Sequence, residues 1–172
     1  RYGSGTIFFA HCNMRCQYCQ NYELSHLGQG STRDAAEIAA MMLELQAAGC
    51  HNINFVSPSH VVAQIIEAVA LAAKGGLRLP LVYNTGGYDS LEALALLDGI
   101  IDIYMPDMKY SAAALARQHS KIKDYPLHNR AAVKEMHRQV GDLVLDERGI
   151  AQRGLLVRHL VLPGELAGTA DV

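Results

Sequence analysis

The chain runs GTIFFAHCNMRCQYCQN from Gly5 to Asn21, an apolar run followed at once by a cluster of three cysteines. The run at residues 6–10 is rich in β-branched and aromatic side chains, which predicts a buried strand. Directly after it, Cys12, Cys16 and Cys19 have the spacing Cys-x-x-x-Cys-x-x-Cys. We therefore expect the three thiols to lie in one loop at the carboxyl end of a strand.

Strand and helix patterns alternate along the rest of the chain. Strands are predicted at residues 54–56, 81–83, 100–104 and 155–162, and helices between 31 and 49, 59 and 75, 89 and 99, and at 131–140. Ser59 is expected to cap the second helix, and residues 143–150 to form a hairpin inserted before the fifth strand. The alternation predicts an α/β fold of parallel strands, either a partial (β/α) barrel or an open doubly wound sheet. Both architectures gather functional residues at the carboxyl ends of their strands.

Composition excludes several classes of protein. The 172 residues suit one domain, which we expect to cover residues 1–172, and 50% apolar with 19% charged residues argues against disorder. Fifteen basic and seventeen acidic side chains give a net charge of -2, which argues against a nucleic-acid partner. The most apolar stretch, residues 61–73, is interrupted by Gln64 and Glu67 and falls short of the roughly 18 residues of a membrane span.

Both ends of the chain predict an excised segment. It opens on Arg1-Tyr2-Gly3, with neither an initiator Met nor a targeting signal, and residues 168–172 resemble a new helix being capped. We expect a fold truncated at both ends that lacks its final βα unit, in a protein of the reducing cytoplasm.

The spacing of the cysteines indicates metal binding rather than disulfides, because the thiols are clustered and not spread in pairs. Three thiolates in one loop suit an iron–sulfur cluster with one iron left open for a small molecule. The alternative is a structural zinc with a fourth ligand from His11, His26 or elsewhere, although no second Cys-x-x-Cys element is present. Cys50 lies outside the loop and is interpreted as a buried thiol.

With the aromatic Tyr18 just before the third cysteine, residues 5–21 resemble the first strand and loop of radical S-adenosylmethionine (radical SAM) enzymes. The resemblance extends over essentially the whole chain, and is strongest to proteins like pyruvate formate-lyase activating enzyme. It implies a radical SAM core in which Cys12, Cys16 and Cys19 hold a [4Fe-4S] cluster. The open iron would be chelated by the amino and carboxylate groups of S-adenosylmethionine. An electron from the cluster would then cleave that cofactor to methionine and a 5'-deoxyadenosyl radical, which abstracts hydrogen from substrate.

The same resemblance assigns roles at the end of the fourth strand. Asp107 and Lys109 resemble the Asp-x-Lys element of activating enzymes, so Asp107 would bind the ribose hydroxyls and Lys109 the methionyl carboxylate. Residues two apart on a strand share one face, as a common ligand requires, although a solvated ion pair is the simpler alternative. Tyr18 would lie near the adenine.

Other strand ends differ from the family pattern. Ser57-Pro58-Ser59 stands where the family has a Gly-Gly-Glu turn that accepts from the cofactor ammonium. The oxygens of Ser57 and Ser59 are expected to accept in its place. Asn84 stands where glycyl-radical activators have an Asp near a monovalent cation. Of Arg158 and His159 on the fifth strand, alternation predicts that one points inward.

The resemblance implies an enzyme that installs a glycyl radical on a protein partner, with reduced flavodoxin or ferredoxin as its electron donor. Two alternatives stay open. One is a radical enzyme acting on another substrate, and the other is a non-catalytic module that binds metal or carries electrons.

Overall fold

One six-stranded sheet forms the centre of the computed structural model, which describes residues 3–172; Arg1 and Tyr2 lie outside it. The strand order is β1-β2-β3-β4-β6-β5, with neighbours from β1 to β6 parallel and β5 antiparallel to β6. Their bounds are β1 Ser4–Phe8, β2 Asn52–Val56, β3 Leu81–Thr85, β4 Ile103–Pro106, β5 Val144–Leu145 and β6 Ala151–Leu155. The predicted α/β fold with parallel strands is confirmed.

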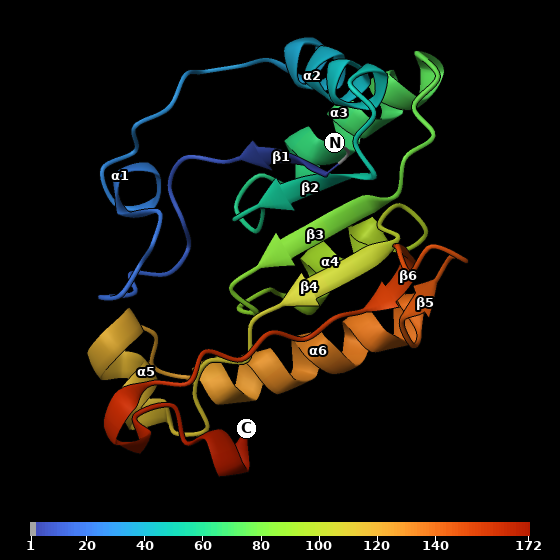
Figure 1. Cartoon of the computed structure of the whole chain (residues 1–172). Helices are drawn as coiled ribbons and strands as arrows, with labels where there is room; N and C mark the ends of the chain where they lie inside the picture. Colours follow the sequence, from blue (N-terminus) through green and yellow to red (C-terminus); the bar gives the residue numbers. More distant parts are fainter. Residues whose placement is uncertain (1–2) are drawn as a thin grey trace.

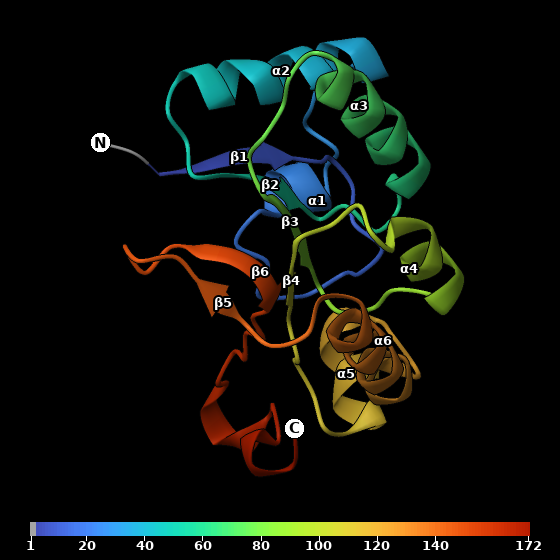
Figure 2. The ribbon, with the colours of Figure 1, turned by 90° about the vertical axis from the view of Figure 1, so that its right-hand side faces the viewer.

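Helices connect the strands and line one side of the sheet. They are α1 Tyr22–Ser25, α2 Ala35–Ala47, α3 Val62–Lys74, α4 Leu91–Leu97, α5 Ala113–Ser120 and α6 Tyr125–Val140, followed by two 3-10 turns, Pro163–Glu165 and Thr169–Asp171. Figure 2 shows α2, α3, α4 and α6 as an arc around the sheet, which gives the fold its partial-barrel shape. None of the helices within residues 3–172 is long and apolar enough to cross a membrane.

The core lies between this arc and the sheet. Ile53, Phe55, Tyr83 and Tyr104 are completely buried there, together with apolar side chains of α2, α3, α4 and α6. Because successive strand residues point to opposite faces, Asn54 and Asn84 face the other, concave side. The arrowheads of β1 to β4 in Figure 1 point to the end of the molecule where α1 and α5 lie, and the cysteine loop is at this end.

Several helices differ from the sequence prediction. α6 begins at Tyr125 rather than at residue 131, with Pro126 in its first turn, where the missing N–H has no cost. α5 was not predicted, because its buried positions, Ala116 and Ser120, give almost no apolar periodicity. The prediction that Ser59 caps α3 is wrong, since the N-cap is Val61 and has no side-chain hydrogen bond.

The fifth strand also differs from its prediction. β6 ends at Leu155, whereas residues 155–162 were expected to form the strand, and β6 is itself the second arm of the predicted hairpin. Beyond Leu155 the chain still follows β4, with the N–H groups of Leu156 and Arg158 donating to Tyr104 and Pro106. Pro106 has no N–H to donate back, so the ladder loses one hydrogen bond there and the regular strand stops.

Candidate active site

The cysteine loop follows β1 and is held from both sides. Cys16 is buried and Cys12 and Cys19 are half-buried, and all four cysteines of the chain are free thiols. On one side the Arg15 guanidinium donates to the carbonyl of Ser25 in α1 at 2.6 Å. On the other side the Arg15 N–H donates to the carbonyl of Ser120, the last residue of α5, at 3.1 Å. These contacts fix where the thiols lie.

The three thiols lie close enough to affect one another. Burial raises the pKa of Cys12 and of Cys16, and the other two thiols raise the pKa of Cys16 further. The Lys109 ammonium and hydrogen bonds to sulfur act in the opposite direction: Met14 N–H lies 3.5 Å from Cys12 Sγ and Ser120 Oγ lies 3.0 Å from Cys16 Sγ. Three neighbouring thiolates, one buried and two half-buried, therefore need a compensating positive charge, which a bound metal group supplies.

The loop fits a cluster better than a single zinc ion. Within residues 3–172, no three His, Cys, Asp or Glu side chains converge closely enough to hold one metal ion, whereas structural zinc needs four ligands around one point. The two histidines considered as a fourth ligand have other neighbours. His11 packs against Gly28, where an added Cβ would overlap its ring, and His26 stacks on Tyr22 with ring centroids 4.4 Å apart. In a cluster each thiolate binds a different iron, so the ligands need not meet at one point.

Charged side chains that follow β4 and β6 meet Asn84 of β3 beside the cysteine loop. Lys109 Nζ lies 2.6 Å from one oxygen of Asp107, and Arg158 Nη2 lies 2.7 Å from the other. Arg158 also donates to Asn84 Oδ1 at 2.7 Å, and Lys109 Nζ lies 6.0 Å from the centre of the Tyr18 ring. The structure thus brings Tyr18, Asn84, Asp107 and Lys109 together.

Arg158 is the member of the Arg158–His159 pair that faces this group. His159 has its Nδ1 2.6 Å from the Met108 carbonyl oxygen and its Nε2 2.9 Å from Thr169 Oγ1. Its ring therefore ties the chain after β6 to the segment that follows β4.

The two serines predicted to face the cofactor have different surroundings. Ser57 adopts a positive φ of 58°, donates its N–H to the Asn84 carbonyl at 3.0 Å, and its hydroxyl lowers the pKa of the neighbouring Cys12. Ser59 Oγ instead lies 3.0 Å from Thr85 Oγ1, which donates to Asp89 Oδ2 at 2.7 Å. Asp89 is 6% exposed, and burial raises its pKa. Ser59 thus belongs to a buried network under the end of β3.

Two residues of α6 that the sequence did not single out support the ends of β3 and β4. The Tyr125 hydroxyl lies 2.8 Å from the Gly86 carbonyl oxygen and accepts from the Lys109 N–H at 3.1 Å. The Asn129 amide donates to the carbonyls of Gly87 and Asp107, both at 2.9 Å. Both side chains are buried, so α6 fixes the turn that carries Asp107 and Lys109 relative to the turn after β3. A polar Asn four residues after a Tyr, on a buried helix face, is the signal that could have identified them.

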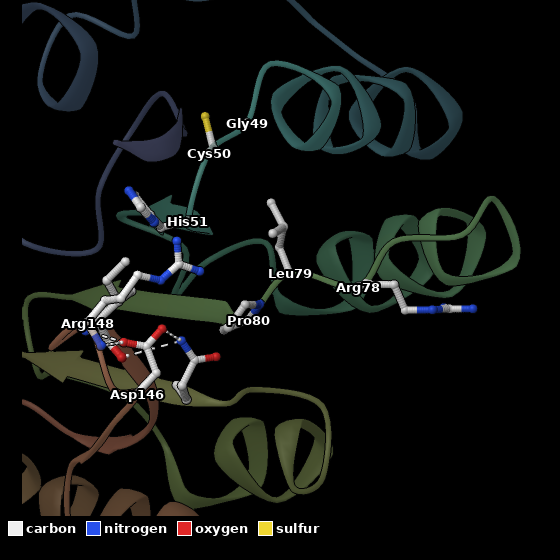
Figure 3. A pocket seen from close by; sticks show the side chains of 10 residues that line it. Gly49, Cys50, His51, Arg78, Leu79, Pro80, Asp146 and Arg148 are labelled. Carbon is white, nitrogen blue, oxygen red and sulfur yellow. Dashed lines mark hydrogen bonds between the residues drawn. The ribbon is translucent and has the colours of Figure 1, made fainter. Parts of the chain in front are cut away.

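A cavity of about 390 Å³ lies at the opposite end of the sheet, and none of the predicted site residues lines it (Figure 3). Its wall comes from the segments before β2 and β3 and from the β5–β6 hairpin, and includes His51, Arg78, Asp146 and Arg148. Cys50 also lines it and is half-buried, which corrects the prediction of a buried thiol.

Comparison with known proteins shows the family to which the chain belongs. A family model described as the Radical SAM superfamily matches residues 6–165. An uncharacterized protein of Methanocaldococcus jannaschii is 29% identical over 171 residues, which are 95% of this chain and 46% of that protein. The chain thus spans about half the length of this curated relative.

Solved structures share the fold at low sequence identity. Methylornithine synthase superimposes with a TM-score of 0.62 at 17% identity over 99% of this chain and 48% of that one. A structure of native anSMEcpe with bound AdoMet superimposes with a TM-score of 0.66 at 12% identity, over 99% of this chain and 47% of that one. With the family match over residues 6–165 and the cysteine loop at the end of β1, the chain belongs to the radical SAM superfamily.

Proposed function

We propose that this chain is the catalytic core of an enzyme that abstracts a hydrogen atom from a protein substrate to install a glycyl radical. Members of the superfamily use a [4Fe-4S] cluster and S-adenosylmethionine, which together supply the 5'-deoxyadenosyl radical. The observation that carries the proposal is the Asp107 carboxylate between Lys109 and Arg158, beside the cysteine loop. The Asp107-x-Lys109 element resembles that of activating enzymes.

Each side chain in this group has a proposed task. Cys12, Cys16 and Cys19 hold the cluster. Lys109, whose ammonium lowers the pKa of Cys12 and of Cys16, binds the methionyl carboxylate next to the cluster. The Asp107 carboxylate, which contacts Lys109 and Arg158 in this structure, accepts hydrogen bonds from the ribose hydroxyls.

The remaining proposed contacts surround this pair. Tyr18 lies against the adenine, and Ser57, the neighbour of Cys12, accepts from the ammonium of the cofactor. Asn84 holds Arg158, so that this guanidinium stays directed at Asp107 when the ribose is bound.

The concave face of the sheet supports a polar substrate segment. Asn54 Oδ1 is buried and has no hydrogen-bond partner within residues 3–172. It projects to the same side of the sheet as Asn84. An amide directed into this side can bind the backbone of a peptide loop that carries the target glycine.

The proposed partners follow from this chemistry. The cluster requires a one-electron donor, for which we propose reduced flavodoxin or ferredoxin, and the four free thiols suit a reducing compartment such as the cytoplasm. Because the chain spans about half the length of its curated relative, these partners and the substrate are proposed for the whole protein.

A turnover assay tests the proposal. The intact protein is reconstituted without oxygen, reduced with dithionite and incubated with S-adenosylmethionine, and 5'-deoxyadenosine and methionine are quantified. We expect equal amounts of both products, a strong loss in Lys109→Met, and no loss in Cys50→Ser. A glycyl-radical signal on an added candidate protein would support the proposed substrate, whereas cofactor cleavage without it would favour another substrate. A full cluster that cleaves no cofactor would indicate an electron-carrying module.

A further inference from the structure

A chain of three hydroxyl groups leads to the most buried cysteine of the loop. The Tyr18 hydroxyl lies 2.6 Å from that of Tyr110, which lies 2.8 Å from Ser120 Oγ, and Ser120 Oγ lies 3.0 Å from Cys16 Sγ. Ser120 is completely buried, Tyr110 is 2% exposed and Cys16 is 9% exposed. The chain thus connects the aromatic residue next to the third cysteine with the sulfur of the second.

Counting hydrogens fixes the direction of this chain. A metal-bound thiolate has no hydrogen to donate, so Ser120 donates its single hydroxyl hydrogen to Cys16 Sγ. The oxygen of Ser120 then accepts from Tyr110, and the oxygen of Tyr110 accepts from Tyr18. All three O–H groups point toward the sulfur, and hydrogen bonds aligned in this way polarise one another and strengthen the last one.

The protein backbone holds Ser120 at this position. Ser120 is the last residue of α5, and Lys121 after it has a left-handed φ of 62° that ends the helix. Two backbone hydrogen bonds join the end of α5 to the cysteine loop, from Arg15 N–H to Ser120 at 3.1 Å and from Gln17 N–H to His119 at 2.8 Å. The distance between the hydroxyl and the sulfur is therefore set by backbone contacts.

We propose that Ser120 is a positioning residue that raises the reduction potential of the cluster by donating a hydrogen bond to the Cys16 sulfur. One electron from an external reductant adds one negative charge to the cluster, and no proton is transferred. A donor aimed at a ligand sulfur stabilises the more negative, reduced cluster more than the oxidised one, and so favours reduction. The inference concerns only the cluster and does not depend on the proposed substrate.

The test is the midpoint potential of the reconstituted, intact protein, followed by electron paramagnetic resonance during a dithionite titration. Ser120→Ala is expected to keep the iron and sulfide content of the parent but to shift the reduction equilibrium about tenfold toward the oxidised cluster, roughly 59 mV for one electron. A hyperfine coupling to an exchangeable proton is expected to weaken in the same variant. Tyr110→Phe, which keeps the ring, is expected to cause a smaller shift in the same direction.

Ser25→Ala provides the matched control. Ser25 is a buried serine on the other side of the same loop, which it contacts through its backbone carbonyl, so its hydroxyl is not needed. We expect no change in its midpoint potential. An unchanged potential in Ser120→Ala with full cluster content would overturn the proposal. If Ser120→Ala fails to assemble a cluster, an unchanged potential in Tyr110→Phe would overturn it.

Discussion

Replacing Gly87 by Ala tests whether α6 holds the ends of β3 and β4 together. Gly87 has a left-handed φ of 75°, and an added Cβ would overlap the Asp107 carbonyl oxygen and the Asn129 amide nitrogen. Gly99 has nearly the same φ, 77°, but nothing lies within 4 Å of its added Cβ. The two substitutions therefore share the left-handed penalty of about 1–2 kcal/mol and differ only in the overlap.

The difference can be worked out from the hydrogen bonds that the overlap breaks. Displacing Asn129 removes donors from two carbonyls, each worth about 1–3 kcal/mol when left unpaired. The Asp107 carbonyl oxygen also lies 3.0 Å from the Tyr125 hydroxyl, which reduces its loss. Gly87→Ala should therefore lower the free energy of unfolding by about 2–4 kcal/mol more than Gly99→Ala.

Urea unfolding of the reduced, metal-free protein, followed by circular dichroism, measures the free energy of unfolding of each variant. Similar slopes of unfolding free energy against urea concentration for the two variants would validate the comparison. Equal destabilisation by the two substitutions would refute the idea that the turn after β3 and the Asp107 turn form one supported unit.

Three further predictions concern the thiols, the carboxylate and a buried acid. Replacing any one of the three loop cysteines by Ser should abolish the visible absorption of the cluster, whereas Cys50→Ser should retain the iron content of the parent. Asp107→Asn should weaken S-adenosylmethionine binding in equilibrium dialysis by about 1–3 kcal/mol, about 5- to 150-fold. Asp98→Asn, which also removes a carboxylate paired with an arginine, should leave binding unchanged. Because burial raises the pKa of Asp89, its contribution to stability is full below about pH 4 and is lost as the pH rises through the folded-state pKa. Asp89→Asn should flatten that decline in urea unfolding measured at a series of pH values.

The amino-acid sequence predicted those strands and helices whose residues show a clear apolar periodicity. The apolar run before Cys12, the helical spacing between residues 31 and 49, and the alternation of strands with helices all describe short segments whose burial follows from their own periodicity. Asp107 and Lys109 could be placed just beyond the end of a strand for the same reason, because the apolar run that predicts β4 comes directly before them.

Contacts between distant segments could not be predicted in this way. Ser120 meets Cys16 across 104 positions of sequence, and Arg158 meets Asn84 across 74. α5 lacks an apolar stripe because one of its two buried positions is Ser120, whose hydroxyl is directed at sulfur. The choice of Arg158 over His159 has no local signal. The spacing of Tyr125 and Asn129 puts both on one face of α6, but which carbonyls they meet depends on how the elements pack.

The central claim is that Cys12, Cys16 and Cys19 hold a cluster whose open iron binds S-adenosylmethionine next to Lys109 and Asp107. Its most direct test is electron paramagnetic resonance of the anaerobically reconstituted, dithionite-reduced protein with and without S-adenosylmethionine. We predict a [4Fe-4S] signal that changes when the cofactor is added and that no longer changes in Lys109→Met. A colourless protein that binds zinc, or a cluster signal unaffected by the cofactor, would contradict the account.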